Sequence, residues 1–186
     1  MRKSHFYPTD DAVIYLDQRL LPNKEVYCTA NTYEQIFEAI ATLQVRGAPL
    51  IGVAAAYGVW LAARVATSPE EVILLCQKAI HKLRSARPTA VNLSTELTRM
   101  ERLLLTFTKE YHLGAGIARL REEADAIRAE DEASCRAIGR YMQEFIPDNA
   151  RILTHCNAGE LATAGYGTAL SGIYTEIGRA SCRERV

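Results

Sequence analysis

A single thiol, Cys156, occupies the most chemically suggestive position in the sequence, within the segment ILTHCNAGELATAGYGT of residues 152–168. The residues before it are short, apolar and β-prone, and the alanine-rich run after Asn157 and Gly159 is compatible with a helix. The pattern predicts a strand that ends near Cys156 and gives way to a helix. Ligands of open α/β sheets bind at such strand ends, and the positive end of a helix favours the reactive thiolate.

A packing role is the alternative for Cys156, because free cysteine is among the most buried residue types. His155 should point to the opposite face of the predicted strand, which argues against a Cys–His pair of adjacent residues. The five cysteines are scattered without a CxxC pair, and the histidines show no ligand spacing, which disfavours a disulfide framework and a zinc site. Cys76 and Cys135 fall on apolar helix faces and are expected to pack in the core.

Two arginines lie in loops that lead into predicted helices. Arg46 belongs to VRGAPLIG at residues 45–52, and Arg87 begins RPTAVNL at residues 87–93, where Pro88 favours an extended loop. A guanidinium beside the free N–H groups at a helix start binds phosphate well. The two loops therefore indicate a phosphorylated substrate, and the alternative is that both arginines are surface charges or caps.

The amino-terminal elements are a small sheet and a helix. Residues 12–16 and 25–29 are β-prone runs separated by a turn-rich stretch, which predicts an antiparallel ribbon. Apolar residues recur at helical spacing over residues 33–44, and Thr32 with Gln35 forms a capping box.

Further helices should follow. Residues 49–66 are dominated by small residues, which predicts a central helix that can be approached closely on every side. A capping signal at Ser68 opens the next helix, and another is predicted over residues 94–111, ended by Gly114 and Gly116.

A long helical pattern covers residues 117–145 and is stopped by Pro147, which suggests a bridge between two domains. Its charged face is expected to be a solvated surface rather than a pair of catalytic carboxylates. The residues of that face are Glu122, Glu123, Asp125, Arg128, Glu130, Asp131 and Glu132.

Composition indicates a globular protein with a small-molecule partner. The chain has 186 residues, 48% of them hydrophobic, and its 22 basic and 22 acidic residues cancel. No basic stripe with aromatic residues points to nucleic acid, and no run is long enough to span a bilayer. The amino terminus lacks the apolar region of a secretion signal, and the unpaired cysteines suggest the reducing cytoplasm.

Four motifs, in order, closely resemble the S-methyl-5-thioribose-1-phosphate isomerase family, which is similar in fold to regulatory subunits of a translation initiation factor. They are LDQRLLP at residues 16–22, VRGAPLIGVAAAYG at 45–58, RPTAVNL at 87–93 and ILTHCNAGELATAGYGTAL at 152–170. The resemblance implies an α/β protein, a homodimer and a place in methionine salvage.

The implied domains divide the chain near residue 148. Residues 1–148 would form a mostly helical domain with a small β-ribbon, including the bridging helix. Residues 149–175 would begin a Rossmann-like catalytic domain with its first βα unit. The last residues, EIGRASCRERV at 176–186, resemble translated sequencing-adapter sequence and are expected to be a non-native tail.

The resemblance also implies the site. Arg46, Gly47, Ala48 and, by motif, Arg87 would contact the phosphosugar. Cys156 matches the family's active-site cysteine, which stabilises the transition state or shuttles a proton. The family needs neither a metal nor an organic cofactor.

The family reaction turns a cyclic aldose 1-phosphate into an open-chain ketose 1-phosphate. Because the phosphate blocks the anomeric hydroxyl, an acid must assist opening at the ring oxygen. In the family this acid is an aspartate in a later segment with no counterpart in these 186 residues. We therefore expect the chain to be a piece of the enzyme that is inactive alone.

Two other functions remain compatible with the motifs. One is a related isomerase of ribose or deoxyribose phosphates, because the residues that select the sugar are largely unresolved in this half. The other is a non-catalytic binding subunit of the translation-factor type, which would not need Cys156.

Overall fold

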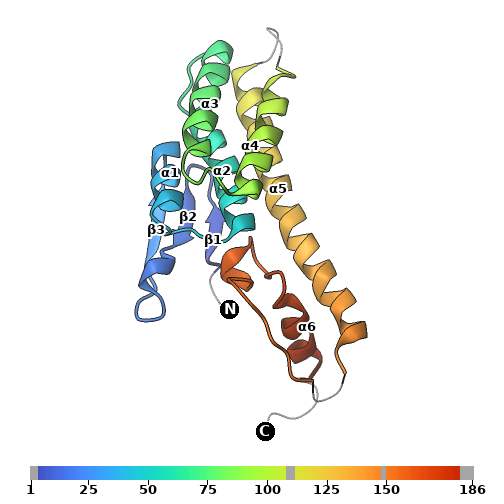
Figure 1. Cartoon of the computed structure of the whole chain (residues 1–186). Coiled ribbons are helices and arrows are strands. Elements are labelled where there is room, and N and C mark those ends of the chain that lie inside the picture. The colour runs from blue at the N-terminus through green and yellow to red at the C-terminus, as the bar shows by residue number, and fades with distance from the viewer. Residues whose placement is uncertain (1–3, 108–111, 148–149, 181–186) are drawn as a thin grey trace.

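Helices dominate the computed structural model, which describes residues 4–107, 112–147 and 150–180 (Figure 1). A bundle of helices stands beside a small sheet, and the carboxyl-terminal residues lie along the far end of the longest helix. The mostly helical α/β architecture predicted for the amino-terminal part is confirmed.

The sheet contains three antiparallel strands in the order β1 (Phe6–Pro8), β2 (Val13–Leu16) and β3 (Tyr27–Ala30). Strands β2 and β3 are the predicted ribbon, shifted by one or two residues. Strand β1 was not predicted, because three residues ending in proline are too few to show an alternating pattern. Phe6 and Val13 are fully buried, so the sheet covers one side of the helical core.

Local capping signals fix the starts of two helices. Helix α1 (Tyr33–Ala41) begins after Thr32, whose hydroxyl accepts from the Gln35 N–H at 3.3 Å while the Gln35 side chain accepts from the Thr32 N–H at 3.2 Å. Helix α3 (Pro69–Arg84) begins after Ser68, which also caps through its hydroxyl. Both capping predictions are confirmed.

Helix α2 (Ala48–Ala63) is the centre of the bundle. Every residue from Leu50 to Ala63 is buried. It packs against α1, α3, α4 (Val91–Leu104) and α5 (Leu113–Met142). Its alanine and glycine content allows these neighbours to approach on all sides, which confirms the prediction of a central helix of small residues.

The predicted position of the break between α4 and α5 is wrong. Helix α4 ends at Leu104 rather than near residue 111, and Gly114 and Gly116 lie in the first turns of α5 instead of ending its predecessor. Glycine costs only about 1 kcal/mol in a helix interior. Tertiary packing outweighs that cost here, since Gly116 is buried.

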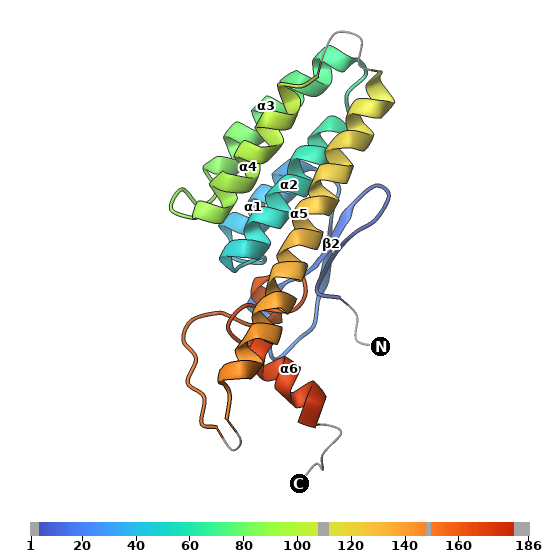
Figure 2. The ribbon, with the colours of Figure 1, turned by 90° about the vertical axis from the view of Figure 1, so that its right-hand side faces the viewer.

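The long helix α5 joins the two ends of the molecule. Its first half packs on α2, and its second half packs on α6 (Ser171–Ala180), as Figure 2 shows. The Gln143 side chain, just beyond α5, donates to the carbonyl oxygen of Gly172 at 2.9 Å. The domain boundary predicted near residues 148–149 lies outside the described residues.

Helix α5 has 30 residues, more than a bilayer requires, but a charged outer surface. Among the described residues, no helix combines the length and apolar character needed to cross a membrane.

The prediction of a strand before Cys156 is wrong. Residues 152–154 form no regular structure, and Leu153 is 95% exposed. A parallel strand needs hydrogen bonds from a neighbouring strand, and the sheet within the described residues consists of β1, β2 and β3 only. The α-helix also begins later in the sequence than predicted, because a short 3-10 helix, η3 (Glu160–Ala162), precedes α6.

The Rossmann-like character of residues 149–175 thus stays a prediction. In the predicted non-native tail, residues 176–180 continue α6, and residues 181–186 lie outside the described part of the chain.

Candidate active site

The turn Arg46–Gly47–Ala48 leads directly into α2. Gly47 has φ of +101°, and a Cβ added there would lie 2.6 Å from the Cβ of Ala162. Glycine is therefore required both by the backbone conformation and by the close approach of a distant segment. No side chain caps the start of α2, so this helix end is suited to an anionic ligand.

The guanidinium of Arg46 is exposed beside this turn. Its Nε donates to Oε1 of Gln18 at 3.4 Å, which is its one hydrogen bond among the described residues. The other N–H groups of the guanidinium remain able to bind a phosphate through two parallel hydrogen bonds. Arg46 is thus an exposed arginine whose guanidinium makes little use of its donors within the described residues.

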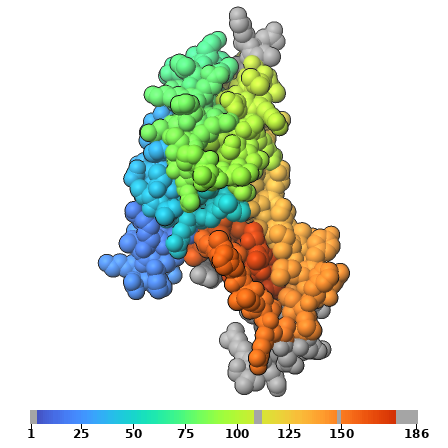
Figure 3. Space-filling view, in the orientation of Figure 1, coloured from blue at the N-terminus to red at the C-terminus, as the bar shows by residue number. Residues whose placement is uncertain are grey.

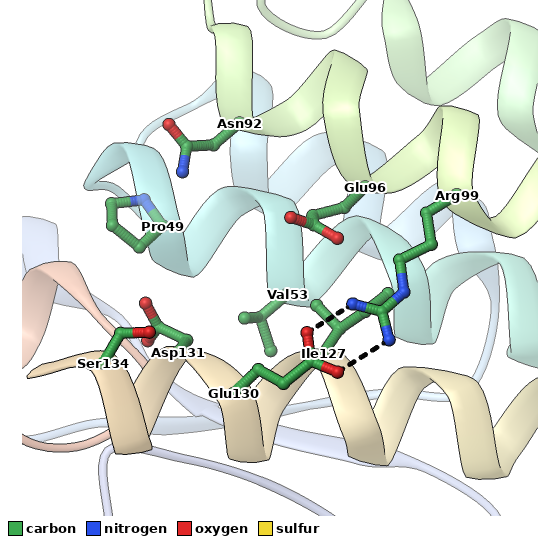
Figure 4. Close-up of a pocket in the computed structure, with 9 residues that line it drawn as sticks. All are labelled: Pro49, Val53, Asn92, Glu96, Arg99, Ile127, Glu130, Asp131 and Ser134. Atoms are coloured by element: carbon green, nitrogen blue, oxygen red, sulfur yellow. Dashed lines mark hydrogen bonds and ion pairs between the residues drawn. The ribbon is translucent and has the colours of Figure 1, made fainter.

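The second arginine motif meets the same end of α2. Arg87 is half-buried in the loop between α3 and α4. A Cβ added to Gly52 of α2 would lie 3.0 Å from the carbonyl oxygen of Asn92, and Pro49 and Asn92 line one cavity (Figure 4). The two loops predicted to bind phosphate therefore lead into neighbouring helix ends.

That cavity, of about 290 Å³, lies between α2, α4 and α5. It is lined by Pro49, Val53, Asn92, Glu96, Arg99, Ile127, Glu130, Asp131 and Ser134. Glu130 holds the Arg99 guanidinium through two hydrogen bonds of 2.5 and 2.9 Å, and Glu123 also pairs with it. Burial raises the pKa of Glu96 and of Asp131.

The cavity is unsuited to phosphate, because carboxyl groups outnumber its single guanidinium and that guanidinium is already paired.

The prediction that the charged face of α5 is a solvated surface is wrong for two of its residues. Asp125 accepts a hydrogen bond from the Tyr57 hydroxyl at 2.5 Å, and Asp131 accepts from the Ala164 N–H at 2.6 Å. Periodicity identifies the apolar face of a helix, but it does not show which of its polar residues pass beside other elements. No sequence signal marks Asp131 as a contact of the carboxyl-terminal segment.

Cys156 lies in an irregular segment and is exposed, as is His155. Its φ is +69°, a left-handed conformation that is uncommon for a residue with a side chain. No described helix begins directly after it, so the predicted effect of a helix end on the thiol has no counterpart in the structure.

The other described cysteines are less accessible. Cys28 is half-buried, while Cys76 and Cys135 are buried, as predicted for both. Burial raises the pKa of Cys76 to about 12 and that of Cys135 to about 11. Among the described cysteines, Cys156 is thus the exposed one.

The segment after Cys156 reaches the Arg46 turn. Helix η3 begins four residues beyond the thiol and packs against the start of α2, where Ala162 meets Gly47. In Figure 3 the orange atoms of this part of the chain lie directly against the cyan atoms of α2. Three of the sequence motifs therefore converge at one end of α2.

The part of the chain that the structure describes contains no group of three His, Cys, Asp or Glu side chains arranged to hold a metal ion.

Gln18 was not predicted as a site residue, although it lies in the motif LDQRLLP of residues 16–22. Gln18 is 2% exposed, and its amide bonds both Arg46 and the backbone of Leu161. A glutamine has no characteristic spacing, so only the three-dimensional structure reveals this contact.

Comparison with known proteins adds independent information. A family model described as the initiation factor 2 subunit family matches residues 44–178. Methylthioribose-1-phosphate isomerase of Parabacteroides distasonis is 48% identical over 170 residues, covering 88% of this chain and 49% of that protein. The protein of the same name from Anaeromyxobacter sp. strain Fw109-5 is 49% identical over 167 residues, covering 90% and 46%. The chain therefore spans about half the length of these curated relatives.

Solved structures share the fold. The crystal structure of 5-methylthioribose 1-phosphate isomerase from Pyrococcus horikoshii OT3 matches with a TM-score of 0.85 and 34% identity, covering 94% of this chain and 50% of that chain. The crystal structure of translation initiation factor eIF-2B subunit delta from A. fulgidus matches with a TM-score of 0.85 and 33% identity, covering 96% and 52%.

Proposed function

The chain belongs to the initiation factor 2 subunit family, and we propose that it is the amino-terminal half of a methylthioribose-1-phosphate isomerase. The full-length protein would convert S-methyl-5-thioribose 1-phosphate into S-methyl-5-thioribulose 1-phosphate in methionine salvage. It would act in the cytoplasm as a homodimer, without a metal or an organic cofactor.

One observation carries this proposal: the Arg46 turn and the segment that follows Cys156 meet at the uncapped start of α2. A phosphate ligand and a thiol of the same site must approach one substrate from different parts of the chain. The contact of Gly47 with Ala162, six residues beyond Cys156, supports such an approach.

We assign the substrate contacts to four residues. The Arg46 guanidinium and the backbone of Gly47 and Ala48 would hold the phosphate at the helix start, and Arg87 would contact the phosphosugar from the adjacent loop. Such binding orients the sugar and leaves its ring free to react.

The chemistry requires more than this half contains. An acid must protonate the ring oxygen, since the phosphate prevents opening through the anomeric hydroxyl. Cys156 would then stabilise the transition state or carry a proton between the two carbons. We place the acid, an aspartate by family resemblance, in the remaining half of the enzyme, with residues 149–175 as the start of its Rossmann-like domain.

Two alternatives have specific support. The sequence motifs also fit an isomerase of ribose or deoxyribose phosphates. The similarity to the eIF-2B delta structure fits a non-catalytic subunit that binds another protein. The accessible Cys156 and the names of the curated relatives favour the methylthioribose enzyme.

Turnover by the full-length protein tests the proposal. We expect it to form the ketose phosphate from methylthioribose 1-phosphate more efficiently than from ribose 1-phosphate or deoxyribose 1-phosphate, measured as kcat/KM for each. A preference for one of the other sugars would establish the related isomerase. Absence of turnover on all three by folded protein would favour the binding subunit.

Replacing Arg46 by lysine should weaken substrate binding. Loss of a charged hydrogen bond costs about 1.5–3 kcal/mol, so KM of the full-length enzyme should rise about tenfold or more. Lysine keeps the charge but not the planar fork of donors. Steady-state kinetics of Arg46→Lys measure this rise.

Arg19→Lys is a matched control, because Arg19 is a nearby arginine that already pairs with Asp17 at 2.7 Å. It should leave KM unchanged. An unaltered KM in Arg46→Lys would return Arg46 to a structural role.

A further inference from the structure

Polar side chains of the amino-terminal elements hold the backbone of residues 160–164, which we call the docking segment. Gln18 donates from Nε2 to the carbonyl oxygen of Leu161 at 2.7 Å. Asp131 of α5 accepts from the Ala164 N–H at 2.6 Å. The docking segment is thereby fixed from two different elements.

A third contact comes from the start of the chain. Nε2 of the buried His5 lies 2.9 Å from the carbonyl oxygen of Thr163, and its Nδ1 lies 3.9 Å from the Glu160 carboxylate. Cys156 is therefore followed within a few residues by backbone that three side chains anchor to the helical domain.

Gln18 differs from the other two anchors because it also contacts Arg46. Its Oε1 accepts from Nε of Arg46 at 3.4 Å, while its Nε2 bonds Leu161. A guanidinium only donates and a carbonyl only accepts, so these partners fix which end of the amide faces which. The backbone N–H of Gln18 donates to the Gln44 carbonyl oxygen at 3.0 Å, which holds the residue in place.

We propose that Gln18 is a positioning residue of the isomerase site, whose side-chain amide holds the Arg46 guanidinium and the docking segment after Cys156 in a fixed relation. This inference rests on the proposed function of Arg46 and Cys156. Gln18 itself is buried, and its proposed role is to position Arg46 and the docking segment rather than to bind the substrate.

The physical reason lies in the two ends of the amide. The partly buried carbonyl of Leu161 is stabilised by a donor, and an exposed arginine side chain loses conformational freedom when it is held in one orientation. The Gln18 amide donates to the Leu161 carbonyl. It also orders the Arg46 side chain before the substrate binds, so less conformational entropy is lost on binding. Pre-ordering of a ligand-binding side chain strengthens binding without adding a contact to the ligand.

Kinetics of Gln18→Met in the full-length protein test the link to Arg46. Methionine preserves length and apolar volume but removes both hydrogen bonds. We expect KM for methylthioribose 1-phosphate to rise about three- to tenfold, less than for loss of a direct charged hydrogen bond, because Gln18 acts on the phosphate only through Arg46. In the double variant with Arg46→Lys the effects should be less than multiplicative, because Gln18 acts on KM through Arg46.

Gln44→Met provides the matched control. Gln44 is a glutamine of the same region whose side chain bonds Tyr15 and Thr42 rather than Arg46 or Leu161. Its KM should match wild type. Equal KM changes in Gln18→Met and Gln44→Met, or multiplicative effects in the double variant, would overturn the proposal.

Amide hydrogen exchange tests the link to the docking segment independently of activity. The N–H groups of Ala162 and Thr163 donate to the carbonyl oxygens of Gly159, just before this segment, and of Glu160, its first residue. In Gln18→Met these amides should exchange about five- to tenfold faster than in wild type or Gln44→Met, as expected for weakened local structure. Unchanged exchange would refute the anchoring role.

Gln18→Glu separates the two contacts. A carboxylate still accepts from Arg46 but cannot donate to Leu161. It should therefore show faster exchange in the docking segment with KM closer to wild type than that of Gln18→Met. A KM as high as in Gln18→Met, with normal exchange, would contradict this division.

Failure of the proposed function gives a distinct result. If the wild-type full-length protein turns over no sugar phosphate, the isomerase assignment fails, while the exchange comparison still decides whether Gln18 anchors residues 160–164.

Discussion

Cys156→Ser in the full-length protein should lower kcat about a hundredfold or more, because a positioned acid–base group contributes typically 10²–10⁴-fold. Serine preserves the size of the side chain but neither the acidity nor the polarizability of the thiol. KM should change little, since the phosphate contacts lie at Arg46 and the start of α2. Measurement of kcat and KM per folded molecule gives the result directly.

Cys135→Ser is the informative comparison. Cys135 is buried, and burial raises its pKa to about 11, so this thiol stays protonated near neutral pH. Its replacement should lower the thermal unfolding midpoint and leave kcat per folded molecule unchanged. The opposite pattern, with Cys156→Ser destabilised but fully active, would show that Cys156 packs and does not react.

The exposure and the backbone conformation of Cys156 are the observations that bear on its expected role in turnover. The thiol is exposed, and the backbone holds a left-handed φ of +69° that a side chain disfavours. Such conformations persist where the surrounding structure requires them, and they cluster at functional sites. The docking segment four residues later ties this backbone to the helical domain.

Local signals made much of the amino-terminal fold predictable. The Thr32–Gln35 capping box and the Ser68 cap each involve residues within one turn, so the sequence contains the whole interaction. The central position of α2 was also predictable from the sequence, because neighbouring elements can pack on every side of a run of alanine, glycine and valine. Gly47 was expected at a turn before this helix, and its φ of +101° agrees.

Contacts between distant residues were not predictable. Strand β1 exists because Phe6 faces Tyr15 across the sheet, and three residues alone carry no period. Residues 152–154 show the converse: their apolar character predicts a strand, but a strand also needs a neighbour. Gln18 and Leu161 are separated by 143 positions, and neither residue type signals the other.

The site was therefore predicted as a set of motifs rather than as a geometry. Turn chemistry identified Arg46 and Gly47, and family resemblance gave Cys156 its role. Neither source indicated that Gly47 would pack on Ala162.

The 186 residues expressed alone should show no isomerase activity, even though their helical domain folds. The proposed reaction needs an acid at the ring oxygen, and we propose that this acid belongs to the remaining half of the enzyme. Catalytic groups also act only when held near the productive geometry, and displacement by about 1 Å can cost a hundredfold. Cys156 sits in an exposed irregular segment that no strand supports.

The assay compares purified residues 1–186 with the full-length protein and with its Cys156→Ser variant, at equal concentrations of folded protein. Circular dichroism should report a helical fold for the shorter chain, since α1–α5 share one buried core. Turnover should fall at least to the level of Cys156→Ser. Activity near that of the full-length enzyme would show that this half contains every group the chemistry needs.

Self-association of the isolated chain should accompany the loss of activity. Leu153, Phe145 and Tyr141 are 95%, 80% and 66% exposed, and they lie along the end of α5 and the segment that follows it. Exposed apolar surface of this kind is normally covered by another element or another molecule. Sedimentation velocity should show oligomers that grow with concentration, and Leu153→Ser with Phe145→Ser should reduce them without restoring turnover. Recovery of activity in that double variant would mean that self-association had caused the loss of turnover. The proposed lack of an acid and of a fixed position for the Cys156 thiol would then be wrong as explanations.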